Sequence, residues 1–67
     1  MLSARNQFKG TIKEVKLGVV MAEVVVSVGE NEVVSLISKT SAERMKLKAG
    51  DKVTAIIKAT EVMVDKS

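Results

Sequence analysis

The sequence predicts an all-β fold of five strands with one short helix between the third and fourth strands. Short segments rich in β-branched residues predict the strands, and glycines at positions 10, 18, 29 and 50 separate them. A polar stretch around residue 40 has the pattern of a helix start. Each element follows from its own residues.

Residues 5–17 are predicted to form the first strand. Its apolar residues change parity between Ile12 and Val15, so they cannot share one face of a regular strand. We therefore expect a bulge or a sharp bend between Gly10 and Glu14, as strands that curl into small barrels require.

Residues 19–28 (VVMAEVVVSV) are predicted to form the second strand because β-branched residues dominate them. Both faces of this strand are largely apolar. One face can line a barrel. The other apolar face needs to be covered, and we expect another subunit to cover it. Residues 29–31 form a turn, and residues 32–38 are the returning strand of a hairpin.

Residues 40–47 (TSAERMKL) are predicted to form one or two helical turns. Thr40 followed by Glu43 fits a capping box with Thr40 at the N-cap. The residues expected to face inward are Ala42 and either Met45 or Leu47.

Two strands are predicted after the helix. Residues 52–58 alternate, with Val53, Ala55 and Ile57 on the inward face. Residues 61–65 are predicted to form a short last strand after a bend at residues 59–60. This order of elements is that of a five-stranded OB-like Greek-key barrel.

The composition indicates one domain, residues 1–67, that associates with copies of itself. The chain has no cysteine and no histidine, which excludes disulfides and a Cys/His zinc site. Hydrophobic residues are 46% of this short chain, which is hard to hide in one small monomer and indicates subunit interfaces. No signal peptide or membrane span is visible, so we expect a cytoplasmic protein without a membrane partner.

The residue types argue against an enzyme and for anion binding. Without His or Cys, and with most carboxylates at turns or outward strand positions, catalysis is not expected. A tetrahedral dianion needs fixed N–H and O–H donors and a cation. Such groups are present in three stretches, residues 3–7, 38–41 and 58–60. The last two also have a simpler interpretation: Thr40 and Ser41 could serve only as helix caps, and Lys58 could be a solvated residue on the outer face of its strand.

Four segments resemble the molbindins, the small molybdate-binding proteins of the Mop family, whose module is also called a TOBE domain. These segments are SARNQFKG at 3–10, LGVVMAEV at 17–24, LISKTSAERMKLKAGDKV at 36–53 and AIIKATEVMV at 55–64. The opening and closing motifs together, in this order and at this chain length, are specific for the family.

The resemblance implies an OB-like barrel that assembles as a hexamer, a trimer of dimers, with N-terminal strands exchanged between partners. It implies molybdate or tungstate held at subunit interfaces by hydrogen bonds, without direct protein–metal ligands, for intracellular molybdenum storage and homeostasis. No other cofactor is expected. The residues carried over as the oxyanion site are Ser3, Ala4 and Arg5 from one subunit and Ser38, Ser41, Lys58 and Ala59 from its partner.

Two other functions remain open from the residues. The first is an OB-type nucleic-acid-binding domain, which the net charge of +3 permits. Phe8 is the one aromatic residue, however, and single-strand binders use aromatic platforms, so no nucleic-acid partner is expected. The second is a regulatory module that binds a protein, which the two apolar faces of residues 19–28 also fit.

Overall fold

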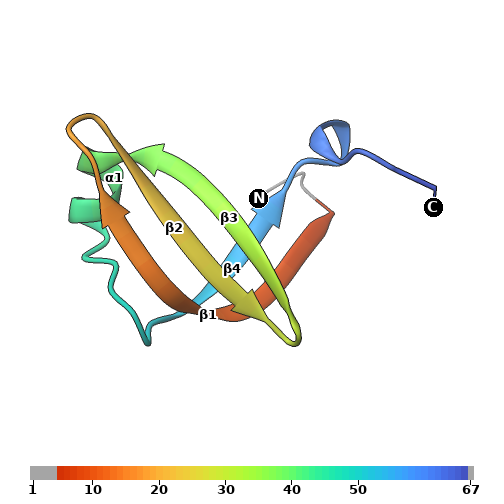
Figure 1. Cartoon of the computed structure of the whole chain (residues 1–67), viewed down its shortest axis with the longest axis horizontal. Helices are drawn as coiled ribbons and strands as arrows, with labels where there is room; N and C mark the ends of the chain where they lie inside the picture. The colour runs from red at the N-terminus through yellow and green to blue at the C-terminus, as the bar shows by residue number, and fades with distance from the viewer. Residues whose placement is uncertain (1–4, 67) are drawn as a thin grey trace.

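The computed structural model describes residues 5–66 as one curled antiparallel sheet with a short helix after its third strand (Figure 1). The strands lie in the order β3-β2-β1-β4. The mostly β fold and the position of the helix confirm the prediction in part. The elements are β1 (Asn6–Leu17), β2 (Met21–Val28), β3 (Asn31–Ser38), α1 (Lys39–Arg44), β4 (Lys52–Ile57) and the 3₁₀ turn η1 (Ala59–Glu61).

The bend predicted in the first strand is present as a bulge in β1. Ile12 is paired with Val26 and Glu14 with Val25, so Lys13 is an extra residue opposite β2. The first half of β1 pairs with β4 and most of the second half with β2. The bulge thus lets one long strand join two parts of the sheet that face each other.

Gly10 of β1 lies close against the backbone and side chains of β2. A Cβ atom at this position would meet the carbonyl oxygen of Ser27 and would lie 2.9 Å from side-chain atoms of Val26 and Val28. A glycine is therefore required here by space and not by an unusual backbone angle.

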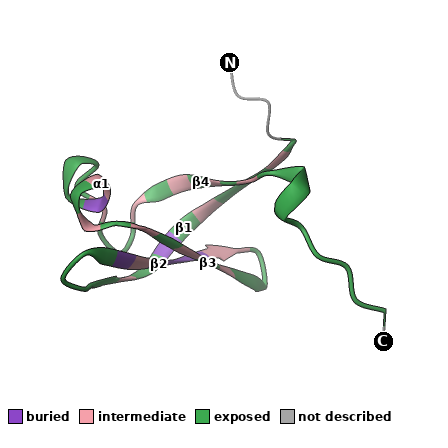
Figure 2. Cartoon of the chain, turned by 90° about the horizontal axis from the view of Figure 1, so that it is seen from above, coloured by how far each residue is buried: buried purple, intermediate pink, exposed green. Residues whose placement is uncertain are grey.

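The core is small and aliphatic. Ile12, Val24 and Val26 form its buried centre, and half-buried residues from β3, β4 and the segment after α1 pack against them. Figure 2 shows the buried positions on β1, β2 and α1 and the exposed C-terminal segment. The inward face predicted for the fourth strand is confirmed, because Val53, Ala55 and Ile57 are half-buried between exposed neighbours.

The second strand starts two residues later than predicted. The backbone N–H of Gly18 donates to the carbonyl of Met21 at 2.8 Å and closes a turn. This turn leaves Val19 and Val20 exposed and outside β2, although their side chains are of the type that favours strands.

The helix begins earlier than predicted, and Thr40 is not its cap. Strand β3 runs to Ser38, which pairs with Met21, and Lys39 is already the first helical residue. Ser38 is the N-cap, so Glu43 does not occupy the third helical position and the predicted capping box is absent. Of the two candidates for the inward position, Leu47 is half-buried and Met45 is 58% exposed.

The predicted last strand, residues 61–65, is not formed within the chain. Residues 59–61 form η1, and residues 62–66 have no regular structure and are exposed. A strand needs a partner edge for its backbone groups, and this segment points away from the sheet (Figure 1). Since β3 and β4 are the two edges of the described sheet, closure into a five-stranded barrel is not observed for residues 5–66.

Candidate functional site

Two of the predicted site residues, Ser38 and Ser41, meet at the junction of β3 and α1. The backbone N–H of Ser41 donates to Ser38 Oγ at 3.1 Å, and Ser38 Oγ donates to Ser41 Oγ at 2.8 Å. The backbone N–H of Lys39 donates to the carbonyl of Val20 at 2.8 Å, which fixes the junction against the β1–β2 turn. This serine pair therefore combines a helix cap with hydroxyl groups near the surface.

The other described site residues gather at the far end of β4. Asn6 of β1 pairs with Ile57 of β4, and its side chain also donates to the carbonyl of Ile57 at 3.3 Å. Arg5 immediately precedes this pair and Lys58 immediately follows it, so the two cations flank one point of the sheet. Ser3 and Ala4 lie outside the described residues.

Lys58 is held in extended backbone at the start of η1, with its side chain exposed. Its carbonyl accepts from the backbone N–H of Glu61 at 2.9 Å, which closes the 3₁₀ turn over Ala59. Within residues 5–66 the ammonium group of Lys58 has no carboxylate partner within 4.0 Å. This cation is therefore available to an anion.

The serine pair and the Lys58 end lie far apart in one chain. Figures 1 and 2 place α1 and η1 at opposite ends of the molecule, whose longest dimension is 35 Å. Ser38, Ser41, Lys58 and Ala59 were expected from one subunit. In the structure the two serines lie at one end of the molecule, and Lys58 and Ala59 lie at the other. Arg5, which was expected from the partner, lies with Lys58 and Ala59. A site that uses both groups needs a second copy of the chain.

A groove of about 540 Å³ separates the two edge strands. Its walls are mostly aliphatic residues of β3 and β4, among them Leu36 and Ile56, which are 65% and 44% exposed. Lys58 and Glu61 lie along the same groove. Its shape and its two free strand edges suit an extended peptide segment better than a small anion.

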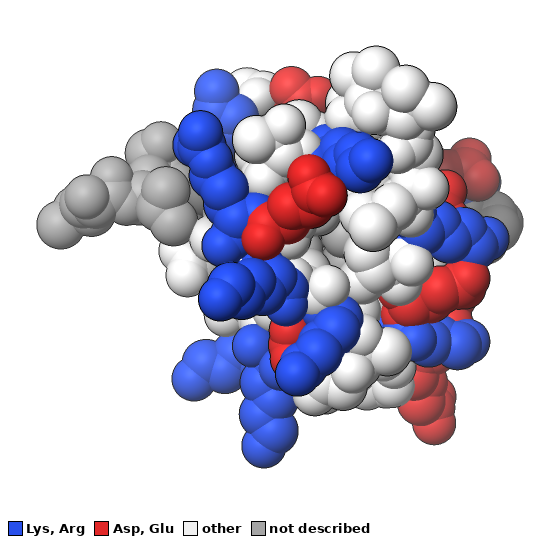
Figure 3. Space-filling view, turned by 90° about the vertical axis from the view of Figure 1, so that its left-hand side faces the viewer, with Lys and Arg blue, Asp and Glu red and all other residues white. Residues whose placement is uncertain are grey.

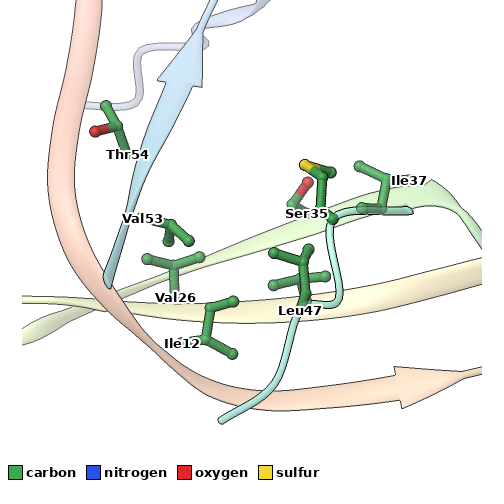
Figure 4. Close-up of a pocket in the computed structure, with 9 residues that line it drawn as sticks. Ile12, Val26, Ser35, Ile37, Leu47, Val53 and Thr54 are labelled. Carbon is green, nitrogen blue, oxygen red and sulfur yellow. The ribbon is translucent and has the colours of Figure 1, made fainter. Parts of the chain in front are cut away.

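A second pocket, beside the core residues, is unsuited to an anion. It has a volume of about 160 Å³ and is lined mainly by Ile12, Val26, Leu47 and other aliphatic side chains (Figure 4). Ser35 and Thr54 contribute the hydroxyl groups of its lining, and no charged residue lines it. We regard it as the core of the curled sheet.

Two other lysines, Lys13 and Lys16, are already paired with carboxylates. Lys13, at the bulge, forms an ion pair with Glu32, and Lys16 lies 3.6 Å from Glu14 and 3.9 Å from Glu23. The hydrogen bond from Lys13 to Glu32, together with the attraction of that carboxylate, raises the pKa of the Lys13 ammonium group. These lysines are therefore less suited to an incoming anion than Lys58 is.

The donor set determines which chemistry is possible. Among residues 5–66 no three His, Cys, Asp or Glu side chains form a group that could hold a metal ion. The residues that do come together offer hydroxyls, backbone amides and ammonium groups, which suit a ligand with acceptor oxygens. No helix of the described part is both long and apolar enough to cross a membrane.

Asn6 belongs to the polar run 3–7 that the sequence singles out, but it is not among the residues expected to bind the oxyanion. Its side-chain bond to Ile57 tethers the start of β1 beside Lys58 and thereby positions Arg5. The polar run at residues 3–7 was the signal available, but the pairing partner of Asn6 depends on the register of β1 with β4, which the sequence does not give.

Comparison with known proteins gives consistent matches over nearly the whole chain. The TOBE domain family matches residues 2–64. Molybdenum-pterin-binding protein 1 of Clostridium pasteurianum is 47% identical over 64 residues, which are 94% of this chain and 94% of that protein.

Solved structures agree with this result. A molybdate binding protein from Sporomusa ovata matches with a TM-score of 0.94 and 42% identity, covering 98% of each chain. The cytoplasmic molybdate-binding protein ModG, solved with molybdate bound, matches with a TM-score of 0.84 and 41% identity. That match covers 87% of this chain and 42% of ModG.

Proposed function

The chain belongs to the TOBE-domain family, among its small Mop-type molybdenum-binding members, and on this premise we propose that it binds molybdate. The observation that carries the proposal is the match to the Sporomusa ovata molybdate binding protein, which extends over 98% of both chains. The resemblance to the molbindins is confirmed by the same match. The relatives are described as binding and transport proteins, which agrees with binding without catalysis.

We propose a site assembled from two copies of a single domain, residues 1–67. One copy supplies Arg5, Lys58 and Ala59, together with Ser3 and Ala4, and the other supplies Ser38 and Ser41. This division differs from the one expected from the sequence. It is supported by the pairing of Asn6 with Ile57 and by the separation of α1 from η1 in one chain.

Each group contributes what a doubly charged oxyanion requires. Lys58 supplies the positive charge, and hydrogen bonds from charged donors are roughly twice as strong as neutral ones. The serine pair supplies hydroxyls, and residues 3–5 and Ala59 supply backbone amides. Tungstate has the same charge and tetrahedral shape, so the same donors would bind it.

An oxyanion fits this chain better than a pterin, although Clostridium relatives are described as molybdenum-pterin-binding. A pterin ring needs aromatic side chains for stacking. Phe8 is the one aromatic residue of the chain, and it lies 41% exposed on β1. A single ring cannot enclose both faces of a pterin.

We propose that the C-terminal segment holds the copies together. Met63 and Val64 are 93% and 92% exposed, and the groove between β3 and β4 presents two unpaired strand edges. Residues 62–65 of one copy would add the missing fifth strand to another copy. Residues 6–11 of β1 pair with β4 and residues 11–17, apart from Lys13, pair with β2 in the same chain, so we place the exchange at the C-terminal segment and not at β1.

The proposed assembly is a hexamer, a trimer of dimers, and the proposed role is molybdenum storage and homeostasis in the cytoplasm. The cytoplasmic relative ModG supports the location. Val19, Val20 and Met21 are 92%, 70% and 46% exposed and lie outside the groove between β3 and β4, so they offer a second apolar surface that supports an assembly larger than two.

Calorimetry of the purified, anion-free protein tests the function. Molybdate, tungstate, sulfate and phosphate are titrated in parallel, and native mass spectrometry measures the assembly. We expect micromolar or tighter binding of molybdate and a mass near six copies. A monomer without heat of binding for molybdate or tungstate would contradict the proposal.

Substitution of Ser38 separates capping from ligand binding. Ser38→Asp keeps an N-cap acceptor, so the free energy of unfolding should change little, whereas Ser38→Ala should lose about 1 kcal/mol. The new carboxylate of Ser38→Asp should repel the dianion and weaken molybdate binding at least about tenfold. Urea denaturation and calorimetry measure the two effects, and full affinity in Ser38→Asp would remove Ser38 from the site.

Substitutions in the C-terminal segment test its role in assembly. Val62 and Val64 share one face of an extended strand, and Met63 lies on the other. Replacing both valines by lysine should shift the mass from hexamer to smaller species, while the matched variant Met63→Lys should shift it less. Because all three side chains are at least half exposed in one chain, the fold of that chain should persist by circular dichroism.

A further inference from the structure

The positive charge of this protein is concentrated in one segment, and the proposed site uses none of the charged residues of that segment. Residues 39–52 contain five of the eleven Lys and Arg residues but only two of the eight Asp and Glu residues. Outside this segment six basic and six acidic residues remain, and their charges cancel. The whole net charge of +3 therefore resides in this segment. The five cations are Lys39, Arg44, Lys46, Lys48 and Lys52.

Within the described residues none of these five cations forms an ion pair, whereas Lys13 and Lys16 do. One of the two acidic side chains of the segment, Asp51, accepts the backbone N–H of Lys48 at 3.1 Å. Figure 3 shows the α1 end, where Lys and Arg side chains gather on one side of the face and alternate with carboxylates on the other. We call the five cations the basic end.

The basic end is attached directly to the serine pair. Lys39 follows Ser38 in the chain, and Arg44 belongs to the same short helix as Ser41. Lys46 has a positive φ of 53°, which directs the chain away from α1 into the exposed segment that carries Lys48. The serine hydroxyls thus lie within a field of unpaired positive charge.

We propose that the basic end attracts doubly charged oxyanions to the site by long-range electrostatics, without contacting them. The inference rests on the proposed function. Attraction through water increases with the charge of the ligand, so a dianion gains about twice as much as a monoanion. Clustered charges of one sign raise the local concentration of an oppositely charged ligand, and salt screens this effect.

Two double variants with the same loss of charge test the proposal. Lys46→Gln/Lys48→Gln removes two charges from the basic end, and Lys9→Gln/Lys13→Gln removes two from β1. All four side chains are exposed, and circular dichroism checks that both variants fold. Molybdate affinity is measured by calorimetry at ionic strengths of about 20 mM and about 300 mM.

At low ionic strength we expect the basic-end variant to bind molybdate about fivefold more weakly than the unmodified protein, and the β1 variant less than about twofold more weakly. At high ionic strength both should bind within about twofold of the unmodified protein. Equal weakening by both variants, or no weakening, would overturn the proposal. Weakening of the basic-end variant that salt does not reduce would indicate direct contact and would also overturn it. If the unmodified protein does not bind molybdate at all, the proposed function itself fails.

Discussion

Replacing Lys58 by methionine should weaken molybdate binding by about 10- to 100-fold and leave the fold unchanged. A hydrogen bond to a charged group contributes about 1.5–3 kcal/mol, and methionine keeps the length of the side chain while removing the charge. Lys58 is exposed and has no carboxylate within 4.0 Å among the described residues, so the single chain should not depend on it for stability.

Calorimetry measures the change, and Lys9→Met is the matched control. Lys9 is an exposed lysine on β1, in the half that pairs with β4, and it carries the same charge. We expect this control to bind within about twofold of the unmodified protein. If Lys58→Met and Lys9→Met bind equally well, Lys58 does not contact the anion.

Replacing Gly10 by alanine should cost about 2–4 kcal/mol of the free energy of unfolding, because the added methyl group would press on the backbone of Ser27. A core of this size supplies about 3–5 kcal/mol in all, so much of the variant should be unfolded at room temperature. Urea denaturation followed by circular dichroism at a fixed protein concentration measures the loss.

Gly29→Ala is the control for this substitution. Gly29 has a positive φ of 58° in the β2–β3 turn, but no atom lies within 4 Å of an added Cβ. Its cost should be about 1 kcal/mol, from backbone conformation alone. Equal costs at the two glycines would mean that the close approach of β1 to β2 at Gly10 does not limit the fold.

The sequence predicted those features of the fold that depend on local pattern. The parity change after Ile12 located the bulge, and the alternation of residues 52–58 identified their inward face. The predicted start of the helix was wrong because Ser38 and Thr40 are both residue types that favour the N-cap. The pairing of Ser38 with Met21 ends β3 at Ser38 and so determines which residue is the N-cap. These two residues are far apart in the chain.

The fifth strand illustrates a different limit. The pattern of residues 61–65 is that of a strand, but a strand forms only where a partner edge is available, and within one chain none is used. The arrangement of the candidate site could not be predicted from the sequence for a similar reason. Its residue types were recognisable from the chain and from family resemblance, whereas their division into two distant groups depends on the curl of the sheet.

The hydrogen bonds within the serine pair determine how many protons the pair can offer to a ligand. Ser38 Oγ accepts from the Ser41 amide, and one of the two hydroxyl protons lies between the two Oγ atoms, so one hydroxyl proton of the pair is left for a ligand. A deprotonated oxygen of an oxyanion can accept this remaining proton. The pair therefore contributes a single hydroxyl donor to an oxyanion, because its second hydroxyl proton holds the two serines together.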